Sequence, residues 1–334
     1  MDKELKVAVV GVGYLGRHHA RIYSKMDNVD LVGVVDSNAQ NAERIADQYG
    51  TRSYTNLDDL PDGLDAVSVA TPTVTHFEIA KHFVEKGVCV LVEKPMTSTL
   101  EEARALDSIV KQSGVVFQVG HIERFNPAMV AIRDMKIEPR FVESHRLAPF
   151  KFRATDVGVI MDLMIHDIDI ILELCPGPIR KIDAVGGSIL SPSEDIANAR
   201  IEFESGCVVN VTASRVSFKS LRRTRIFSSD CFISLDYEKK YALLAQKSAD
   251  LNMQSFDLAG IDATRLDDLK KLLMTDLINV KELKLDEYEP LGAELESFVG
   301  SVRAGGESEV PSTHGLRAIE LAEQVLSAVN NHSW

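Results

Sequence analysis

The chain has 334 residues, 45% of them hydrophobic and 26% charged, so its composition is that of a globular protein, and its length predicts two domains. Its 50 acidic and 37 basic side chains give a net charge of −13, which argues against a nucleic-acid partner. With no apolar run near the roughly 20 residues of a membrane span and no signal-peptide segment, we expect a cytoplasmic protein without a membrane partner.

Strand-like and helix-like segments alternate over the first third of the chain. Short apolar runs, rich in β-branched residues, have the length of buried parallel strands: Lys6–Val10, Leu31–Val35, Ala66–Ala70, Val88–Val92 and Val115–Val119. Helix-like stretches lie between them, at Gly16–Lys25, Ala39–Tyr49, Val74–Lys86 and Thr99–Ser113. Thr99 with Glu102 predicts a capping box. This alternation predicts a doubly wound parallel sheet, the Rossmann type of α/β domain.

The pattern changes after Pro127. We expect a helix at Pro127–Met135, an extended stretch at Arg140–Leu147, a loop through Thr155 and an apolar helix near Asp162–Leu174. Several strand-like runs follow between Ile182 and Ala245. Ile196–Glu204 alternates apolar and polar residues and meets a Ser205-Gly206 turn, which predicts an antiparallel hairpin. A charged segment, Asp262–Asp286, and a final helix, Leu316–Val329, complete the chain.

These elements predict two domains of different type. Residues 1–122 would form the Rossmann domain, and residues 123–334 an α+β domain with an open, mostly antiparallel sheet. We expect the last helix, at 315–330, to pack back on the first domain. The cysteines Cys89, Cys175, Cys207 and Cys231 lack the CxxC spacing of zinc modules, and we expect them to be buried thiols.

A glycine-rich loop follows the first strand. Gly11-Val12-Gly13-Tyr14-Leu15-Gly16 lies between a strand and a helix, and Asp36 follows 20 residues after Gly16. Gly11 would make the tight turn, Gly13 would let the backbone approach a pyrophosphate, and Gly16 would allow close helix–strand packing. A glycine-rich turn without a ligand is the alternative. We expect Asp36 to accept hydrogen bonds from ribose hydroxyls and to repel a 2′-phosphate, which favours NAD over NADP. Ser37 and Asn38 leave NADP open.

Two further motifs lie at the carboxyl ends of predicted strands, the edge where open α/β sheets bind ligands. Thr71-Pro72 and His76 follow Ala66–Ala70, and Glu93-Lys94-Pro95 follows Val88–Val92. Pro95 restricts Lys94, so we expect its ammonium near a nicotinamide, although a solvated lysine is the alternative. The predicted cofactor contacts are Gly11, Gly13, Tyr14, Leu15, Gly16, Asp36, Ser37, Thr71, Pro72, His76, Glu93 and Lys94.

The apolar helix near Asp162–Leu174 carries ionisable residues on one face. At about 100° per residue, Asp162, His166 and Asp169 lie close together. Such a helix is buried, so these groups need partners or a cleft. An internal network and a metal site are alternatives, but no His or Cys cluster lies nearby, and we predict no metal. For alcohol oxidation, His166 would take the hydroxyl proton, Asp162 would fix its tautomer, and Lys94 would stabilise the alkoxide.

These residues resemble the Gfo/Idh/MocA family of NAD(P)-dependent oxidoreductases. The resemblance rests on the Gly11–Gly16 loop, Thr71-Pro72 through Glu93-Lys94-Pro95, Asp162 with His166, and Gly315–Glu323. It implies that Lys94, Asp162 and His166 are the catalytic residues. It also implies that the second domain's open sheet makes homodimer or homotetramer contacts.

Within that family, Met161–Asp169 and Val119–Pro127 are similar to the UDP-N-acetylglucosamine 3-dehydrogenases. This resemblance implies NAD-dependent oxidation of a sugar 3-hydroxyl, yielding a keto sugar for amino-sugar (lipid A or surface glycan) biosynthesis. Met164 stands where many family members have Gly, so substrates of those members do not transfer. The alternatives are a dehydrogenase of another sugar (a UDP-uronate, an inositol or a free aldose) and a non-catalytic dinucleotide-sensing regulator.

A nucleotide sugar needs donors for its pyrophosphate, and arginine binds phosphate bidentately. Besides Lys94, Asp162 and His166, the predicted substrate contacts are therefore His121, Arg124, Asn126 and Arg215. We expect Arg222, Arg223 and Arg225 to be solvated or to lie between subunits.

Overall fold

The structure, a computed structural model, describes residues 4–150, 157–247 and 278–332. The chain divides into two compact units. The first comprises Met1–Phe125 and Tyr288–Gln324, and the second comprises Asn126–Glu287 and Val325–Trp334. The last helix, α9 (Ser312–Asn330), therefore contributes residues to both units.

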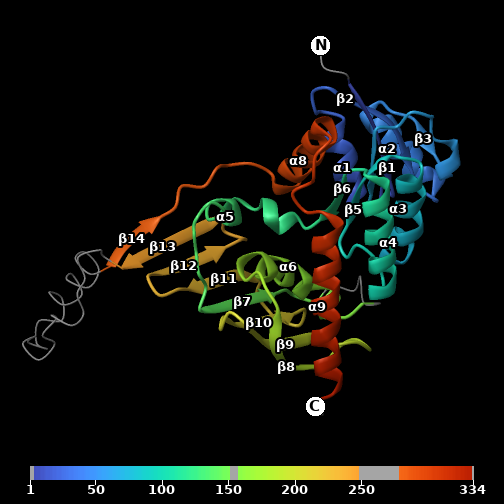
Figure 1. Cartoon of the computed structure of the whole chain (residues 1–334). Coiled ribbons are helices and arrows are strands. Elements are labelled where there is room, and N and C mark those ends of the chain that lie inside the picture. Colours follow the sequence, from blue (N-terminus) through green and yellow to red (C-terminus); the bar gives the residue numbers. More distant parts are fainter. Residues whose placement is uncertain (1–3, 151–156, 248–277, 333–334) are drawn as a thin grey trace, which may run out of the picture. The chain divides into compact units, whose positions relative to one another are not determined.

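The first unit is built on a parallel sheet. Among the described residues it has six strands in the order β3-β2-β1-β4-β5-β6 (Figure 1). Their bounds are Leu5–Val10 (β1), Val29–Val35 (β2), Ser53–Tyr54 (β3), Ala66–Val69 (β4), Cys89–Glu93 (β5) and Phe117–Gly120 (β6). This order is that of a doubly wound Rossmann sheet, which confirms the predicted fold class. The sequence gives no sign of β3, because two residues are too short for any periodicity.

Helices pack on this sheet in the predicted order, at Gly16–Tyr23 (α1), Ala39–Tyr49 (α2), His76–Glu85 (α3) and Leu100–Ser113 (α4). The predicted capping box of α4 is confirmed, with Glu102 N donating to Thr99 Oγ1 at 3.2 Å and Thr99 N donating to Glu102 Oε2 at 3.3 Å. A further helix, α8 (Pro290–Ala304), buries Leu295 and Phe298 in the same core as Tyr23 of α1.

The second unit is built on an open sheet. Within the described ranges its eight strands have the order β14-β13-β12-β11-β7-β10-β9-β8. Only β7 and β10 pair in parallel there, so the sheet is mostly antiparallel, as predicted. The bounds are Phe141–Leu147 (β7), Ile179–Gly187 (β8), Ile196–Phe203 (β9), Val208–Ser214 (β10), Leu221–Phe227 (β11), Cys231–Asp236 (β12), Tyr241–Lys247 (β13) and Ile278–Glu282 (β14).

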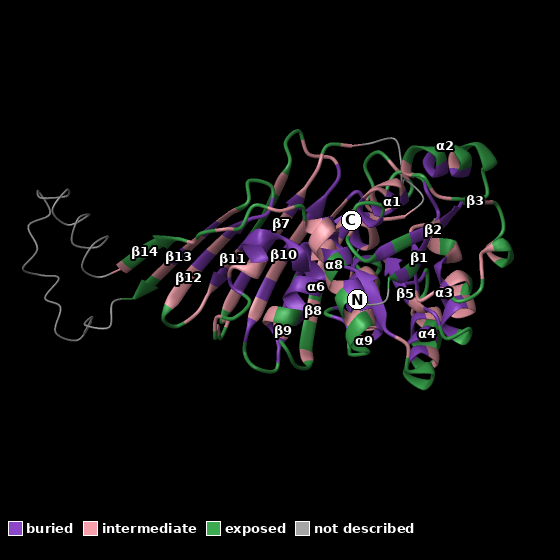
Figure 2. Ribbon diagram, turned by 90° about the horizontal axis from the view of Figure 1, so that it is seen from above, coloured by how far each residue is buried: buried purple, intermediate pink, exposed green. Residues whose placement is uncertain are grey.

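The predicted hairpin is β9 and β10. Val211 lies opposite Ala199 and Val209 lies opposite Ile201, and all four side chains are buried. Figure 2 shows the alternation of buried and more exposed residues as coloured bands along these strands. The apolar residues thus share the inner face of the sheet, which is the reason for the alternating sequence.

The helices of the second unit differ in part from the prediction. The expected helix Pro127–Met135 is shorter, with α5 at Pro127–Val130, because the next residues form tighter turns that bond to the third residue before them. The expected α-helix from Asp162 begins instead with a π-helical turn, η4 (Ile160–Met164), followed by α6 (Ile165–Leu174). Most of the predicted charged segment, and the end of the loop through Thr155, lie outside the described residues.

Candidate active site

The glycines of the first loop have distinct structural roles. Gly11 has a φ of +82°, and a Cβ there would lie 2.8 Å from the carbonyl oxygen of Ala70. A Cβ on Gly16 would lie 1.7 Å from the Gly11 oxygen, so α1 packs directly on the loop. No described atom lies within 4 Å of a Cβ placed on Gly13, which leaves room for a ligand. In the described structure, the side chain of Leu15, the residue before α1, does not cap this helix. A helix N-terminus without a side-chain cap suits the binding of a diphosphate.

Asp36 holds its carboxylate against this loop. Its Oδ2 accepts a hydrogen bond from Val12 N at 3.0 Å, and its Oδ1 accepts one from Asn38 N at 2.9 Å. Ser37 is exposed beside it. The Asn38 side chain caps α2 by accepting from Asn41 N, so it already has a structural task.

The residues after β4 are joined to those after β5 by His76. Thr71 lies against the glycine-rich loop and accepts a hydrogen bond from Thr75 of the turn η2 (Thr73–Thr75) at 2.8 Å, while Pro72 is exposed. His76 is buried, with Nε2 2.9 Å from Thr71 O and Nδ1 2.9 Å from Pro95 O. Both ring nitrogens therefore face carbonyl oxygens of the protein, and a neutral ring donates to one of them. The predicted contact of His76 with a cofactor stays a prediction.

Glu93 and Lys94 stand at the carboxyl end of β5. Glu93 is buried and accepts a hydrogen bond from His19 Nε2 of α1 at 3.0 Å. Lys94 is half-buried, and its peptide bond to Pro95 is cis. His19 was not among the predicted site residues. Its position three residues after Gly16, on the helix face that packs on the sheet, is the sequence pattern that could have indicated it.

The three residues predicted to bind substrate around η3 (Ile122–Phe125) are all buried. His121 is 1% exposed, and Arg124 Nη2 lies 3.4 Å from His314 Nδ1 of α9. Asn126 donates to Tyr237 O at 3.2 Å and accepts from Ala128 N at 3.1 Å, which caps α5. Both ends of its amide thus contact the protein, and the expected contact of Asn126 with substrate stays a prediction.

Asp162 and His166 are half-buried in the second unit, Asp162 in the π-helical turn and His166 in α6. Glu194 holds the start of this turn, because its Oε1 accepts from Ile160 N at 3.2 Å and its carbonyl accepts from Val159 N at 2.9 Å. A Cβ on Gly158 would lie 1.9 Å from that carboxylate, so a larger residue there would displace the Glu194 side chain from Ile160 N. π-Helical turns often occur at functional sites.

The helix that carries His166 is fixed by its neighbour, Asp167. This buried carboxylate accepts hydrogen bonds from Arg146 Nε at 2.6 Å and Ser144 Oγ at 2.7 Å, both on β7. Ser144 Oγ in turn lies 2.8 Å from Thr224 Oγ1 of β11. Asp167 therefore anchors α6 to the sheet, a role that the sequence analysis did not assign.

Arg215 clamps a loop. It donates to Asp195 Oδ1 and Val157 O at 2.7 Å each and, through Nη2, to Ser191 Oγ at 2.7 Å. Asp195 is fully buried and also accepts the backbone amides of Ile189 and Ser191. Its donors thus hold the segment between β8 and β9, and the expected contact of Arg215 with substrate stays a prediction.

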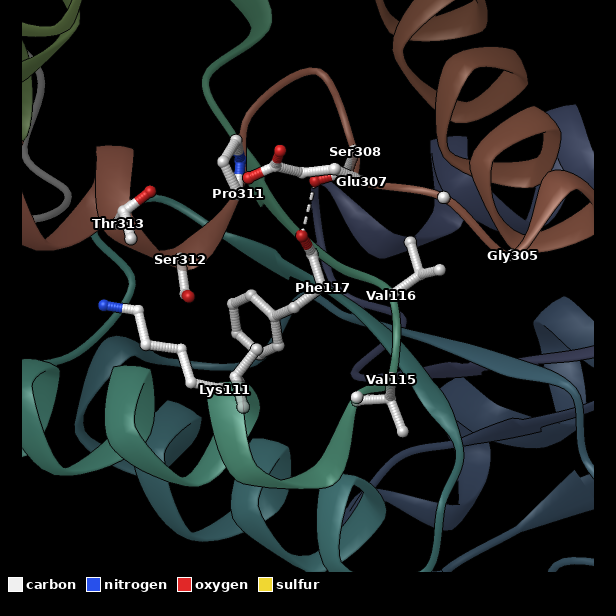
Figure 3. Close-up of a pocket in the computed structure, with 13 residues that line it drawn as sticks. Lys111, Val115, Val116, Phe117, Gly305, Glu307, Ser308, Pro311, Ser312 and Thr313 are labelled. Carbon is white, nitrogen blue, oxygen red and sulfur yellow. Dashed lines mark hydrogen bonds between the residues drawn. The ribbon is translucent and has the colours of Figure 1, made fainter.

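A cavity of about 340 Å³ lies in the first unit, away from these motifs (Figure 3). It is lined by the end of α4, the start of β6 and the start of α9, including Lys111, Phe117 and Ser312. It thus lies at the amino end of β6, whereas the motifs follow the carboxyl ends of strands, and we assign it no part in the reaction. In the described part of the chain no helix could span a membrane, and no cluster of three or more His, Cys, Asp or Glu side chains could hold a metal.

Two family matches cover much of the chain. Residues 5–121 match an oxidoreductase family with an NAD-binding Rossmann fold (GFO_IDH_MocA), and residues 134–233 match the GFO/IDH/MocA C-terminal domain. The chain is similar to the UDP-N-acetylglucosamine 3-dehydrogenase of Acidithiobacillus ferrooxidans, with 36% identity over 97% of each protein. It is also 32% identical to the scyllo-inositol 2-dehydrogenase (NAD(+)) of Bacillus subtilis, over 65% of this chain and 69% of that one.

Solved structures give the same picture. The structure of the Acidithiobacillus ferrooxidans UDP-N-acetylglucosamine 3-dehydrogenase matches with a TM-score of 0.86 at 35% identity and covers 97% of both chains. A levoglucosan dehydrogenase in complex with NADH matches with a TM-score of 0.82 at 20% identity, over 99% of this chain and 98% of that one. At that identity the second likeness concerns the fold alone.

Proposed function

Since the chain belongs to the Gfo/Idh/MocA family of NAD-binding oxidoreductases, we propose that it is an NAD-dependent dehydrogenase that oxidises a secondary hydroxyl of a sugar to a ketone. The proposed substrate is UDP-N-acetylglucosamine, oxidised at its 3-hydroxyl to supply an aminotransferase of amino-sugar biosynthesis. The observation that carries this choice is the full-length similarity to the Acidithiobacillus ferrooxidans enzyme of that name.

The residues of the first unit suit a dinucleotide. The amides of Tyr14 and Leu15, together with the open position at Gly13, would hold the diphosphate, and Asp36 would accept hydrogen bonds from the adenosine ribose. Its carboxylate would repel a 2′-phosphate, so we propose NAD rather than NADP. When bound, NAD would supply a nicotinamide ring that accepts the hydride from the carbinol carbon.

The proton has a separate route. His166 would accept the hydroxyl proton as general base, and Asp162 would hold the imidazole in the tautomer whose bare nitrogen faces that hydroxyl. The Lys94 ammonium would stabilise the negative charge that develops on the oxygen. Arg124 remains our candidate for the substrate's diphosphate, because guanidinium groups bind phosphate oxygens bidentately.

A substrate panel tests the proposal. Purified protein would be incubated with NAD and, separately, with UDP-N-acetylglucosamine, a UDP-uronate, myo- and scyllo-inositol, and free aldoses, while NADH absorbance is followed. We expect the highest kcat/KM with UDP-N-acetylglucosamine. Higher activity on an inositol would favour the second candidate, which the Bacillus subtilis relative supports. NAD binding without turnover of any sugar would contradict the enzyme assignment and favour a regulator.

Replacement of Lys94 tests its role in the same assay. Lys94→Met keeps the length of the side chain and removes its charge, so we expect turnover to fall by about two to four orders of magnitude while NAD binding is retained. Isothermal titration with NAD and steady-state kinetics give the two quantities. Full turnover in this variant would remove Lys94 from the mechanism.

We also propose that the partner of the chain is a second copy of itself, contacting the sheet face opposite to α6. Phe141, Phe227 and Phe232 lie side by side there, with ring centroids 5.7 and 4.9 Å apart, and all three are half-buried. The same face carries both signs of charge, such as the Arg225–Glu143 pair. Two-fold pairing of identical surfaces requires such self-complementarity.

A further inference from the structure

Two buried histidines hold the residues on either side of Lys94. His19, from α1, contacts the side chain of Glu93, the residue before Lys94, at 3.0 Å. His76, from α3, contacts the carbonyl oxygen of Pro95, the residue after it, at 2.9 Å. Both imidazoles are at most 1% exposed. Neither ring can therefore contribute to a surface, and both are directed at the same three-residue segment.

The contact between His19 and Glu93 is an ionic hydrogen bond. Burial by itself would raise the pKa of Glu93, but the hydrogen bond from His19 and the positive charges nearby hold that pKa below its usual range. An ionised carboxylate only accepts hydrogen bonds, so Nε2 of His19 carries the proton. Gly120 leaves the space for this carboxylate, since a Cβ there would lie 3.1 Å from Glu93 Oε2. The side chain of Glu93 is thus fixed from two sides.

The contact of His76 has a different form. Its Nδ1 faces Pro95 O and its Nε2 faces Thr71 O, so the ring lies between the ends of two neighbouring strands, β4 and β5. A neutral ring carries one N–H, and we place it on Nδ1, where it donates to Pro95 O. Lys94 is the residue between Glu93 and Pro95, and its side chain is half-buried. A long flexible amine needs a fixed backbone if its charge is to stay within reach of one oxygen atom.

We infer that His19 and His76 are positioning residues, which hold the backbone on both sides of Lys94 and thereby fix where its ammonium stands. Neither touches the reacting atoms in this scheme. The inference rests on the proposed role of Lys94 in the reaction. It assigns a task to His19, and it replaces the cofactor contact expected for His76 with one that acts through Pro95.

Amide substitutions of different reach test the inference. A glutamine amide takes the place of Nε2 of a histidine, and an asparagine amide takes the place of Nδ1. At position 19 the working nitrogen is Nε2, so His19→Gln should keep activity and His19→Asn should lose it. At position 76 the nitrogen that holds Pro95 is Nδ1, so the order reverses, with His76→Asn active and His76→Gln impaired. A general loss of stability would not produce opposite orders at the two positions.

The expected loss in each impaired variant is about 10²-fold in kcat, the scale of a small misplacement of a catalytic group, with KM and the NAD dissociation constant nearly unchanged. His82→Gln, on the same helix as His76 and directed at Asp58, is the matched control and should behave as the parent protein. Equal activity of the two amides at both positions would overturn the inference, as would a loss of NAD binding that parallels the loss of kcat.

A second measurement needs no substrate. Hydrogen exchange followed by mass spectrometry reports the amides of Lys94, Met96 and Thr97, and we expect about tenfold faster exchange in His19→Asn and His76→Gln, with β1 and β4 unchanged. If the protein oxidises no sugar, the proposed function is wrong. The exchange rates of the paired variants then still test whether His19 and His76 hold the backbone around Lys94. Exchange at these amides that does not differ between the paired variants would refute the positioning role.

Discussion

Individual buried charges in this protein are held by several partners each. Burial would raise the pKa of Asp195, but hydrogen bonds from Ser191, Leu190 and Arg215 hold that pKa well below its usual range. The buried carboxylate of Asp167 likewise accepts hydrogen bonds from more than one partner, Ser144 and Arg146. Such saturated carboxylates fix loops and helices, because an ionised group inside a protein is tolerated only when its hydrogen bonds are complete.

The charge of Asp36 provides a prediction about the cofactor. Asp36→Ala removes the carboxylate that would repel a 2′-phosphate, so the ratio of kcat/KM for NAD to that for NADP should fall by at least tenfold, equivalent to about 1.4 kcal/mol. Steady-state kinetics with both cofactors measures the ratio. Asp47→Ala removes an exposed carboxylate of α2 that is not among the predicted cofactor contacts, and it serves as the control. An unchanged ratio in Asp36→Ala would contradict the ribose contact.

His76 provides a prediction about acid stability. Burial lowers the pKa of His76 below 6.5, although the two carbonyls act in the opposite direction. Below pH 6.5 the unfolded chain therefore binds more protons at this residue than the folded chain, and the free energy of unfolding falls as pH falls toward the folded pKa. Well above pH 6.5 the ring is neutral in both the folded and the unfolded chain, so His76 no longer makes the free energy of unfolding depend on pH.

Chemical denaturation between pH 7.5 and about pH 5 would measure this slope, which is at most about 1.4 kcal/mol per pH unit for one proton. His76→Asn has no titrating ring, so its stability should depend less on pH across the same range. Parallel pH profiles for the two proteins would show that His76 does not make this contribution.

For single residues, the sequence predicts roles in nearby backbone turns well and contacts between residues far apart in the chain poorly. Gly11, Gly16 and Thr99 act on neighbouring backbone, and their predicted roles agree with the structure. The protein contacts of Arg215 and Asn126 were not predicted, because two of their partners, Ser191 and Tyr237, lie 24 and 111 residues away. An arginine that clamps a loop and one that binds phosphate look the same until the fold supplies the partner.

Among the elements, α6 and its π-helical turn depend on contacts from the sheet. Glu194 holds the start of the turn, and Arg146 holds Asp167 within the first turn of α6. Ion pairing of a buried charge on α6 with β7 thus adds a specific contact to the apolar packing of this helix.

Asp167→Asn should therefore destabilise the second unit. The substitution removes the negative charge that accepts from Arg146 Nε, and we expect the free energy of unfolding to fall by about 3–5 kcal/mol. Urea denaturation measures the change. Asp183→Asn, which breaks an exposed pair with Lys181 on β8, should have little effect. Equal effects of the two substitutions would mean that Asp167 does not anchor α6.

Elements with a clear period were predicted, and elements without one were not. The strands and helices of the Rossmann sheet, and the hairpin of β9 and β10, follow from alternation and helical spacing. The π-helical turn could not be predicted, because its sequence is as compatible with an ordinary α-helix. The helix α8 was missed because its period of apolar residues is weak, although Pro290 opens it and Gly305 closes it.

For the molecule as a whole, the motif-based resemblance is confirmed by matches over both units. Local motifs were sufficient to predict the family, because each motif places characteristic side chains at the carboxyl end of one strand. They did not suffice for assembly, because a sheet face is formed by residues from many strands. On the sheet face opposite to α6, for instance, the fold brings together Phe141 of β7, Phe227 of β11 and Phe232 of β12.

The proposed self-association has a direct test. Phe227→Asp places a charge in the aromatic cluster, and we expect the mass measured by light scattering after gel filtration to fall from that of a dimer or tetramer to that of one chain. Phe218→Asp adds the same charge at a fully exposed phenylalanine and should leave the mass unchanged. A parent protein that is monomeric at micromolar concentration would refute the proposal.

The first unit is completed by the last part of the chain. Leu295 and Phe298 of α8 share its core, Val119 N donates to Val310 O at 2.9 Å, and Leu100 N donates to Glu323 at 3.1 Å. During synthesis, β6 is therefore complete before its later contacts exist, since Gln118 donates to the carbonyl oxygen of Glu294, 176 residues further along the chain. The nucleotide-binding half of this protein reaches its finished form only after α8 and Glu323 have been made, and a chain that ends before residue 290 leaves part of this core exposed to water.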